Sequence, residues 1–444
     1  MQSIKNLLVA IIFSILPLSA FSQLSVSSGG KMEAITPEAN SGLDNVYILN
    51  NLTTTTISYT STNAAVKFYK YTHNYDTDRV EIPSGDISVQ SSGSSTTYTI
   101  SNLEDSKGYV ADDNDQKAIW IIDYGLHLPT INSLSIEETS EERCNIAIKL
   151  LVNKSEDNLQ YYRFKKSNTA PIGIARSYKL EYMTLAWKES NLSYEEKLIG
   201  KIEKTHDSFI ISGLSNLPLK DTNFSVWDVL TEKLGFTVQK ATLEYKAVAV
   251  EGHVIAKQEN DDGTEEALNT SERISAPLKV KLYGYANEPT AALYNWYIYN
   301  SNDKVNYIAN FSDKNTTYTF NQFGSFFIRL EVSSIGGCTY TTEDITLQIA
   351  ESSLEIPNWF SPGDSPGIND EFKVKHESIV EFKCVIFNRW GNKVYEFSDP
   401  NEGWDGKYKG KYVNPGVYFY KISARGSDGI RYNKQGDINI TRSK

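Results

Sequence analysis

The sequence predicts an all-β protein made of tandem immunoglobulin-like antiparallel β-sandwich domains that follow a cleaved signal peptide. Many short segments alternate apolar and polar side chains, as residues 66–71 do, and a period of two is typical of half-buried strands. Glycine, asparagine, aspartate and serine interrupt these segments at short intervals, as turns between strands require. The 28 tyrosines and 7 tryptophans provide large rings for several separate cores.

The N-terminal segment has the pattern of a secretory signal peptide. Lys5 precedes an apolar run over residues 7–16, Pro17 ends the run, and small side chains such as Ala20 precede the expected cleavage before Gln23. The run is shorter than the roughly 20 residues that cross a bilayer as a helix. No later apolar run in the sequence reaches that length. We therefore expect a mature chain without a transmembrane segment that folds outside the cytoplasm.

Interruptions rich in turn residues divide the mature chain into four predicted domains. Pro129 follows the end of the first domain, and an acidic loop at residues 259–263 lies shortly before the third. Each domain is large enough to bury a core of its own. The expected divisions are a signal peptide at residues 1–22, a β-sandwich at 23–128, an immunoglobulin-like sandwich at 129–270, a third sandwich at 271–351 and a C-terminal domain at 352–444.

The second domain contains two stretches that are compatible with helices. Ser193 and Glu196 have the spacing of a capping box ahead of an apolar run, although residues 197–202 fit a strand equally well. Residues 227–234 are compatible with a short helix that Gly235 ends. A long apolar run at residues 241–255 is expected to be a strand of the same domain.

The formal net charge of −11 is distributed unevenly along the chain. The acidic excess lies in residues 23–353, whereas the C-terminal domain is slightly basic. An acidic body repels nucleic-acid phosphates and anionic membranes, so neither is an expected partner. The weakly basic C-terminal domain is compatible with docking to an acidic surface, although ordinary solvated faces are the simpler explanation.

The three cysteines, Cys144, Cys338 and Cys384, lie in three different predicted domains. We therefore expect no disulfide framework within a domain. The interpretation that we favour is small buried side chains or lone thiols, with pairing between molecules as the alternative.

The sequence contains no catalytic or metal-binding signature. The spacings typical of metallopeptidases, serine hydrolases and zinc sites are absent. Asp112, Asp113 and Asp115 could supply oxygen ligands to calcium, but a solvated turn is the expectation. We therefore predict a protein that is not an enzyme and has no catalytic residue, metal site or cofactor. The histidines are scattered singly, at His73, His127, His206, His253 and His376.

The third domain carries an aromatic pattern. A tryptophan strand at residues 295–299 is followed by the aromatic segment 318–320, and a Gly-aromatic turn leads into residues 324–332. This pattern resembles that of PKD domains. The resemblance implies an immunoglobulin-like sandwich in which the tryptophan strand packs against the strand after the Gly-aromatic turn.

Two hairpins are predicted in the C-terminal domain. Residues 380–388 alternate in polarity and turn at Gly391 and Asn392 into residues 393–397. A second hairpin joins residues 417–424 to residues 430–434. Large rings, including those of both tryptophans at positions 390 and 404, are expected to fill the core of this domain.

The motifs of the C-terminal domain also follow a particular order, at residues 356–363, 368–372, 386–395, 404–406, 415–420 and 436–438. This order is similar, nearly end to end, to the gliding-motility-associated C-terminal domain, the type B sorting domain of the type IX secretion system of Bacteroidota. Residues 362–367 differ from the loop that is usual in this family, which puts metal binding there in doubt.

The resemblance implies export in two steps. The Sec pathway carries the chain to the periplasm, and the outer-membrane type IX translocon then recognises the folded C-terminal domain and moves the protein to the cell surface. The implied partners are this translocon and its attachment machinery. The residues expected to present or support the recognition surface are Asn388, Arg389, Trp390, Gly391, Trp404, Asp405 and Gly406.

We therefore expect an extracellular, surface-exposed structural or adhesin-like protein with a glycan or protein ligand. One alternative is an accessory or regulatory component of the type IX system itself, resembling PorA-like proteins, to which residues 218–224 give loose support. A secreted enzyme that acts on glycans or peptides is a further alternative, although nothing in the sequence singles out a catalytic pair of carboxylates.

Overall fold

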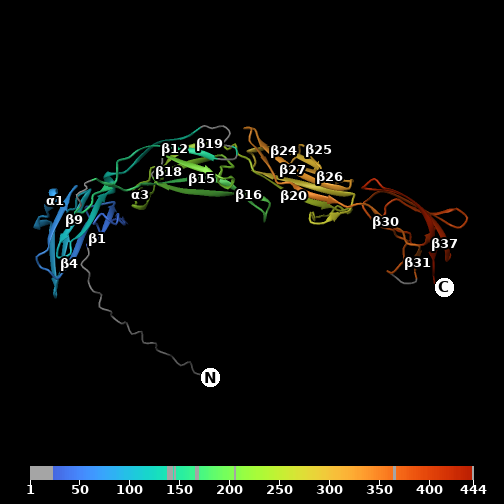
Figure 1. Cartoon of the computed structure of the whole chain (residues 1–444), viewed down its shortest axis with the longest axis horizontal. Helices are drawn as coiled ribbons and strands as arrows, with labels where there is room; N and C mark the ends of the chain where they lie inside the picture. The colour runs from blue at the N-terminus through green and yellow to red at the C-terminus, as the bar shows by residue number, and fades with distance from the viewer. Residues whose placement is uncertain are drawn as a thin grey trace, which may run out of the picture.

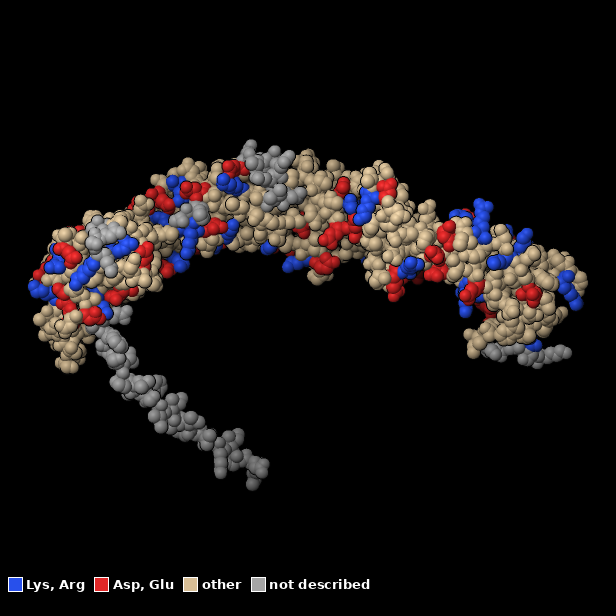
Figure 2. Space-filling model, viewed as in Figure 1, with Lys and Arg blue, Asp and Glu red and all other residues tan. Residues whose placement is uncertain are grey.

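Three β-sandwiches and a C-terminal β-domain follow one another in chain order along a gentle arc (Figure 1). The computed structural model describes residues 24–137, 144, 147–165, 170–204, 207–363 and 367–442; the predicted signal peptide and His206 lie outside them. Acidic and basic side chains are interspersed over the visible face of all four units (Figure 2). The architecture confirms the predicted all-β fold class.

The first sandwich encloses an aromatic core between its two sheets, where Tyr59, Phe68 and Tyr98 pack together. The strands are antiparallel except for β10, which pairs in parallel with β3. A short helix, α1 (Tyr75–Asp78), follows β5. The sheets have the orders β1 (Ser25–Ser28), β4 (Thr55–Ser61), β8 (Ser95–Ile100), β7 (Ile87–Ser92) and β2 (Met32–Ile35), β3 (Asn45–Leu49), β10 (Lys117–Asp123), β9 (Lys107–Asp112), β5 (Lys67–Tyr71), β6 (Val80–Glu81).

The second of these sheets is buried on both faces. On β10, Ile119 faces the core of the first sandwich, whereas Trp120 belongs to a second cluster that includes Phe164 and Leu234 of the second domain. The Trp120 ring contacts that of Tyr162, with centroids 5.8 Å apart. Burial on both faces explains why β10 reads as a continuous apolar run and does not alternate. The first two domains therefore share a hydrophobic interface.

A buried polar network lies at the same joint. The Arg176 side chain is 3% exposed and donates hydrogen bonds to the Tyr124 hydroxyl at 2.6 Å and to Asp157 Oδ1 at 2.8 Å. Tyr124 in turn donates to Asp228 at 2.7 Å. Burial and the negative charge of Asp228 raise the pKa of Tyr124, so the phenol keeps the proton that it donates.

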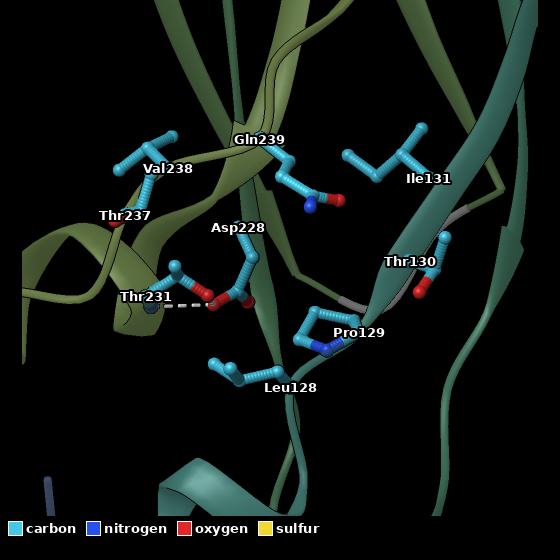
Figure 3. Close-up of a pocket in the computed structure, with 9 residues that line it drawn as sticks. All are labelled: Leu128, Pro129, Thr130, Ile131, Asp228, Thr231, Thr237, Val238 and Gln239. Carbon is cyan, nitrogen blue, oxygen red and sulfur yellow. Dashed lines mark hydrogen bonds between the residues drawn. The ribbon is translucent and has the colours of Figure 1, made fainter.

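A cavity of about 150 Å³ opens beside this network, between the start of β11 (Thr130–Ile136) and the loop after α3 (Val229–Lys233) (Figure 3). Asp228 lines the cavity and accepts hydrogen bonds on Oδ2 from Tyr124 and from the backbone and hydroxyl of Thr231. The other carboxylate oxygen has no hydrogen-bond partner among the described residues. The cavity is large enough to hold a water molecule that hydrogen-bonds this oxygen. We therefore interpret the cavity as part of the polar network between the first two domains.

His127 makes the joint sensitive to pH. Partial burial alone would lower its pKa, but hydrogen bonds to Asp157 and Asp105 outweigh that effect and raise the pKa above its usual value. A histidine whose folded pKa is raised stabilises the fold fully below the unfolded pKa of about 6.5, and this contribution is lost as pH rises through the folded pKa. We expect the unfolding temperature of the first two sandwiches to fall as pH rises from about 6.5 through the raised pKa of folded His127.

Calorimetry of the wild type and of His127→Gln across this range measures the effect. The variant should lack that part of the slope, whereas a control, His73→Gln, should keep it. An unchanged slope in His127→Gln would contradict the assignment.

Among its described residues, the second sandwich is mainly β, with a five-residue helix and a short 3-10 helix at Leu214–Asn216. Residues 193–202, which the sequence left open between helix and strand, belong to the long strand β16, because they pair along their whole length with β15. The predicted helix at 227–234 is shorter, with Asp228 as its N-cap. The elements are β11 (Thr130–Ile136), β12 (Ala147–Ser155), β17 (Ser208–Ser212), the small hairpin β13 (Gln160–Tyr161) and β14 (Ile172–Gly173), then β16 (Ser193–Lys204), β15 (Ser177–Lys188), β18 (Thr222–Asp228), α3 (Val229–Lys233) and β19 (Ala241–Tyr245).

The third sandwich begins earlier in the chain than the sequence predicts. Two strands within residues 252–267, which the sequence assigned to the second domain, belong to a sheet of the third sandwich: β20 pairs with β23, and β21 pairs with β20. The apolar run at 241–255 is consequently split between two domains. The sheets have the orders β21 (Glu265–Ala267), β20 (Gly252–Glu259), β23 (Leu278–Ala286), β26 (Asn315–Phe320) and β22 (Arg273–Ile274), β29 (Ile345–Ile349), β27 (Gly324–Ser334), β24 (Ala291–Asn300), β25 (Asp303–Phe311), with β28 (Thr339–Thr341) also paired to β27.

The core of the third sandwich centres on the fully buried Trp296, which lies opposite Leu330 on β27 and donates a hydrogen bond to the Asp313 carbonyl at 3.0 Å. The tryptophan strand and the strand after the Gly-aromatic turn are thus neighbours, as expected. The resemblance to PKD domains stays a prediction.

A disulfide joins the second and third sandwiches. Cys144 and Cys338 are bonded, 194 residues apart in sequence. The prediction of lone thiols is therefore wrong for these two residues: the fold brings together cysteines of adjacent domains, which the sequence spacing does not show. Buried Asn287 ties the same joint through bonds to the Leu219 and Ala249 carbonyls at 2.7 and 3.0 Å.

The C-terminal domain is built on one five-stranded sheet and contains both predicted hairpins. Serines connect it to the third sandwich: Ser378 accepts from the Ala276 amide at 3.1 Å, and Ser427 donates to the Ala350 carbonyl at 2.9 Å. The large sheet has the order β31 (Trp359–Phe360), β38 (Arg431–Ile440), β37 (Gly416–Gly426), β33 (Ile379–Phe387), β34 (Lys393–Phe397), and the small pairs are β30 (Ser353–Glu355) with β32 (Lys375–Glu377) and β35 (Lys407–Tyr408) with β36 (Lys411–Tyr412).

Candidate functional site

Trp404, one of the predicted recognition residues, lies in the core of the C-terminal domain. Its side chain is fully buried against Phe360 and Tyr418 and donates a hydrogen bond to the Lys407 carbonyl at 2.9 Å. Its backbone pairs with Phe372 through two bonds. Trp404 is therefore a core residue whose side chain presents no surface to solvent.

The two residues after Trp404 shape a turn. Asp405 accepts from the backbone and side-chain nitrogens of Lys407 at 3.0 and 2.7 Å. Gly406 has a φ of +75°, and a Cβ there would lie 2.7 Å from Pro362. Both features are structural, because they fix the start of the β35–β36 hairpin.

The turn between β33 and β34 presents the remaining predicted residues. Asn388 Oδ1 accepts from the amides of Trp390 and Asn392, both at 3.0 Å, and Gly391 adopts a φ of +79°. This turn directs Trp390 into solvent with 71% of its surface exposed, and the Arg389 guanidinium lies 4.4 Å from its ring centroid. The expectation that Trp390 fills the core is therefore wrong, because the tight turn leaves its ring no neighbouring layer.

A groove of about 590 Å³ runs from this turn to the β35–β36 hairpin. Its lining combines aromatic, amide and basic side chains with two valines, and it contains no carboxylate. The sequence prediction found two of these residues and missed the hairpin, whose alternation of lysine and tyrosine at residues 407–412 was the available signal. The lining residues are Asn388, Trp390, Asn392, Lys393, Val394, Tyr408, Lys411, Tyr412, Val413, Asn414 and Tyr418.

Cations lie over several rings at the groove. Lys407 Nζ is 4.9 Å from the centroid of the Tyr412 ring, and the Arg442 guanidinium is 5.2 Å from the same centroid. Tyr412 itself is 43% exposed. Such pairs of an aromatic face and a cation keep the rings ordered in water. The groove thus combines partly exposed aromatic rings with basic side chains in and beside its lining.

Calcium candidates are not supported by the geometry. Asp113 accepts hydrogen bonds from Ser61, Asn63 and Tyr59, so its oxygens hold the local turn together. Among the described residues, no three His, Cys, Asp or Glu side chains gather in a way that could hold a metal ion. The loop at residues 362–367 differs from the one that is usual in the family of sorting domains, and its middle lies outside the described residues.

None of the helices that the structure describes is long and apolar enough to span a membrane.

Two family models match parts of the chain. Residues 354–440 match the CHU_C type IX secretion signal domain, and residues 136–243 match a fibronectin type III domain. A comparison with curated protein sequences finds no match.

Solved structures that resemble the chain are similar only distantly. A tetra-tandem repeat from the extending region of a large adhesion protein is 11% identical, with 89% of this chain and 98% of that chain covered and a TM-score of 0.23. A Ca2+-stabilised adhesin from an Antarctic bacterium is 9% identical, with 94% of this chain and 100% of that chain covered and a TM-score of 0.21. Dimeric latent PorU from Porphyromonas gingivalis is 10% identical, with 75% of this chain and 36% of that chain covered and a TM-score of 0.16. Superpositions of this quality carry no inference about function.

The order of motifs in the C-terminal domain thus agrees with an independent family match over the same residues. A fibronectin type III domain is an immunoglobulin-like sandwich, which agrees with the sheets of the second unit. The chain therefore carries a type IX secretion signal domain at residues 354–440, behind a fibronectin type III domain at residues 136–243.

Proposed function

We propose that this chain is a type IX-exported cell-surface protein with a structural and binding role of the adhesin kind. A type IX secretion signal domain at the C-terminal end supports export to the cell surface. The three preceding sandwiches are joined by a hydrophobic interface, a disulfide and buried hydrogen bonds, so they can hold a binding face at a fixed distance from the sorting domain.

The exposed Trp390 on its tight turn is the observation that carries the export part of this proposal. Single exposed apolar residues are common, but Trp390 stands beside a contiguous groove of tyrosines and lysines. Trp, Tyr and Arg are the residues that most often dominate protein recognition. The proposal assigns the Asn388–Asn392 turn and the groove to recognition by the translocon, with Trp404, Asp405 and Gly406 supporting them from below.

Trp390→Ala in the full-length chain is expected to abolish most surface display. A tryptophan at the centre of an interface contributes about 2 kcal/mol or more, which is roughly thirtyfold in affinity. The fold should be unaffected, because the side chain lies in solvent. Surface protease digestion of intact cells, compared with digestion of lysed cells, measures the fraction displayed and the fraction retained in the periplasm.

Trp359→Ala is the matched control. Trp359 is 42% exposed and lies on β31, at the edge of the sheet opposite β34. That variant should be displayed normally. Normal display of Trp390→Ala, or an equal loss with Trp359→Ala, would remove the groove as the recognised surface.

A further inference from the structure

The outer face of the β29-β27-β24-β25 sheet in the third sandwich is aromatic where polar side chains are expected. Antiparallel sheets with one face in solvent normally place polar residues on that face. Here Tyr297 and Tyr299 of β24, Tyr307 of β25 and Phe327 of β27 all point away from the buried Trp296 layer.

These rings form one connected platform. The ring centroids of Tyr297 and Tyr299 are 6.2 Å apart with their planes at 29°. The Tyr307 ring lies 5.5 Å from Tyr297 with the planes at 55°, and it meets Tyr299 edge-on at 6.5 Å. Tyr299 is paired in register with Phe327 on the neighbouring strand. Tyr307 is 50% exposed at the edge, whereas Tyr299 is 8% exposed at the centre. The buried Tyr299 therefore holds the centre of the platform in place, and the side formed by β25 is open to solvent.

Polar groups border the platform and are already charge-balanced. The Arg329 guanidinium lies 5.5 Å from the Tyr299 ring centroid and forms two bonds with Asp344, at 2.7 and 3.0 Å. Glu331 raises the pKa of Tyr297 together with burial, which is the larger cause, so the phenol is neutral. Lys304 also borders the platform, with its Nζ 4.2 Å from the centroid of the Phe327 ring. Its charge offsets that of Glu331, so the surroundings offer hydrogen-bond donors and acceptors without a formal net charge that would select an ion.

The exposed apolar area is too small for a stable protein partner. An aromatic side chain has a total surface of about 150–250 Å², and the exposed parts of these four rings amount to roughly 300 Å² at most. A stable protein interface buries about 800 Å² on each partner. An area of this size suits two or three rings of a small flat ligand.

We propose that this platform binds a neutral saccharide chain. The flat C–H faces of pyranose rings stack on tyrosine rings, and their hydroxyls can bond the Arg329–Asp344 pair and the phenol groups. Tyr307 and Tyr297, whose ring centroids lie 5.5 Å apart with their planes at 55°, can each contact one sugar unit of such a chain. This inference rests on the proposed function only in placing the chain at the cell surface, and it concerns a site separate from the sorting groove.

Affinity electrophoresis of the purified mature chain in gels that contain laminarin, xylan, galactomannan, dextran or starch tests the proposal. At least one polysaccharide should retard the wild type. Tyr307→Ala should weaken that retardation at least tenfold, and Tyr307→Phe should keep most of it, because the ring remains. Tyr307 lies half-exposed on an edge strand, so the fold tolerates both changes.

Tyr408→Ala, which removes an equally exposed tyrosine from the sorting groove, is the matched control and should bind like the wild type. The proposal is overturned if none of the five polysaccharides retards the chain, if Tyr307→Ala binds normally, or if Tyr408→Ala loses binding. The measurement uses purified protein, so its failure is distinct from a failure of export.

Discussion

Replacing Cys144 and Cys338 together by serine is expected to uncouple the third sandwich from the second and to lower its unfolding temperature strongly. The bond closes a loop of 194 residues, and cross-links over long loops reduce the entropy of the unfolded chain the most. A loss of about 3 kcal/mol is typical for such a bond, which corresponds to roughly 12–24 °C for a domain of about 100 residues.

Calorimetry of the double variant and of the wild type with and without a reducing agent measures this change. The reduced wild type should melt like the double variant, with an additional transition that the oxidised chain lacks. Cys384→Ala is the control, because Cys384 is free and buried in another domain. Identical melting of the oxidised wild type and the double variant would show that the bond does not stabilise the joint.

The sequence predicts the individual strands and hairpins of this chain better than it predicts the contacts between its domains. Hairpins such as β33–β34 follow from alternation and a Gly-Asn turn, which are local. The disulfide could not be found this way, since Cys144 and Cys338 belong to different sandwiches and only the packing of the two domains brings them together. The start of the third sandwich was misplaced for a similar reason: β20 continues an apolar run that begins in the second sandwich.

Burial was also harder to predict at the candidate site than elsewhere. Trp390 and Trp404 are both large apolar side chains within a few residues of a glycine, yet one is exposed and the other fully buried. The difference comes from the Asn388 side chain, whose two bonds to backbone amides close a turn too tight to fold Trp390 back onto the sheet. Neither the spacing of apolar residues nor the amino-acid composition predicts such a hydrogen bond. The groove likewise depends on two hairpins that meet only in the fold.

Trp404→Ala should have the larger effect of the two tryptophan substitutions on stability. Truncating a fully buried tryptophan costs about 3–5 kcal/mol, which is comparable to the whole stability of many small domains. Trp404 also ties together Phe360, Tyr418 and the strand-like bridge to Phe372. We therefore expect the C-terminal domain of this variant to be largely unfolded and the chain to remain in the periplasm.

Cys384 provides the measurement, because it is the chain's free thiol and is fully buried in the same core. Burial raises its pKa to about 12, so the native thiol should resist alkylation, and Trp404→Ala should make it react rapidly. Trp390→Ala should leave the thiol protected while display is lost, which separates recognition from folding. A Trp404→Ala chain that is displayed normally with a reactive Cys384 would mean that the translocon reads an unfolded segment, and the groove could not be the recognised feature.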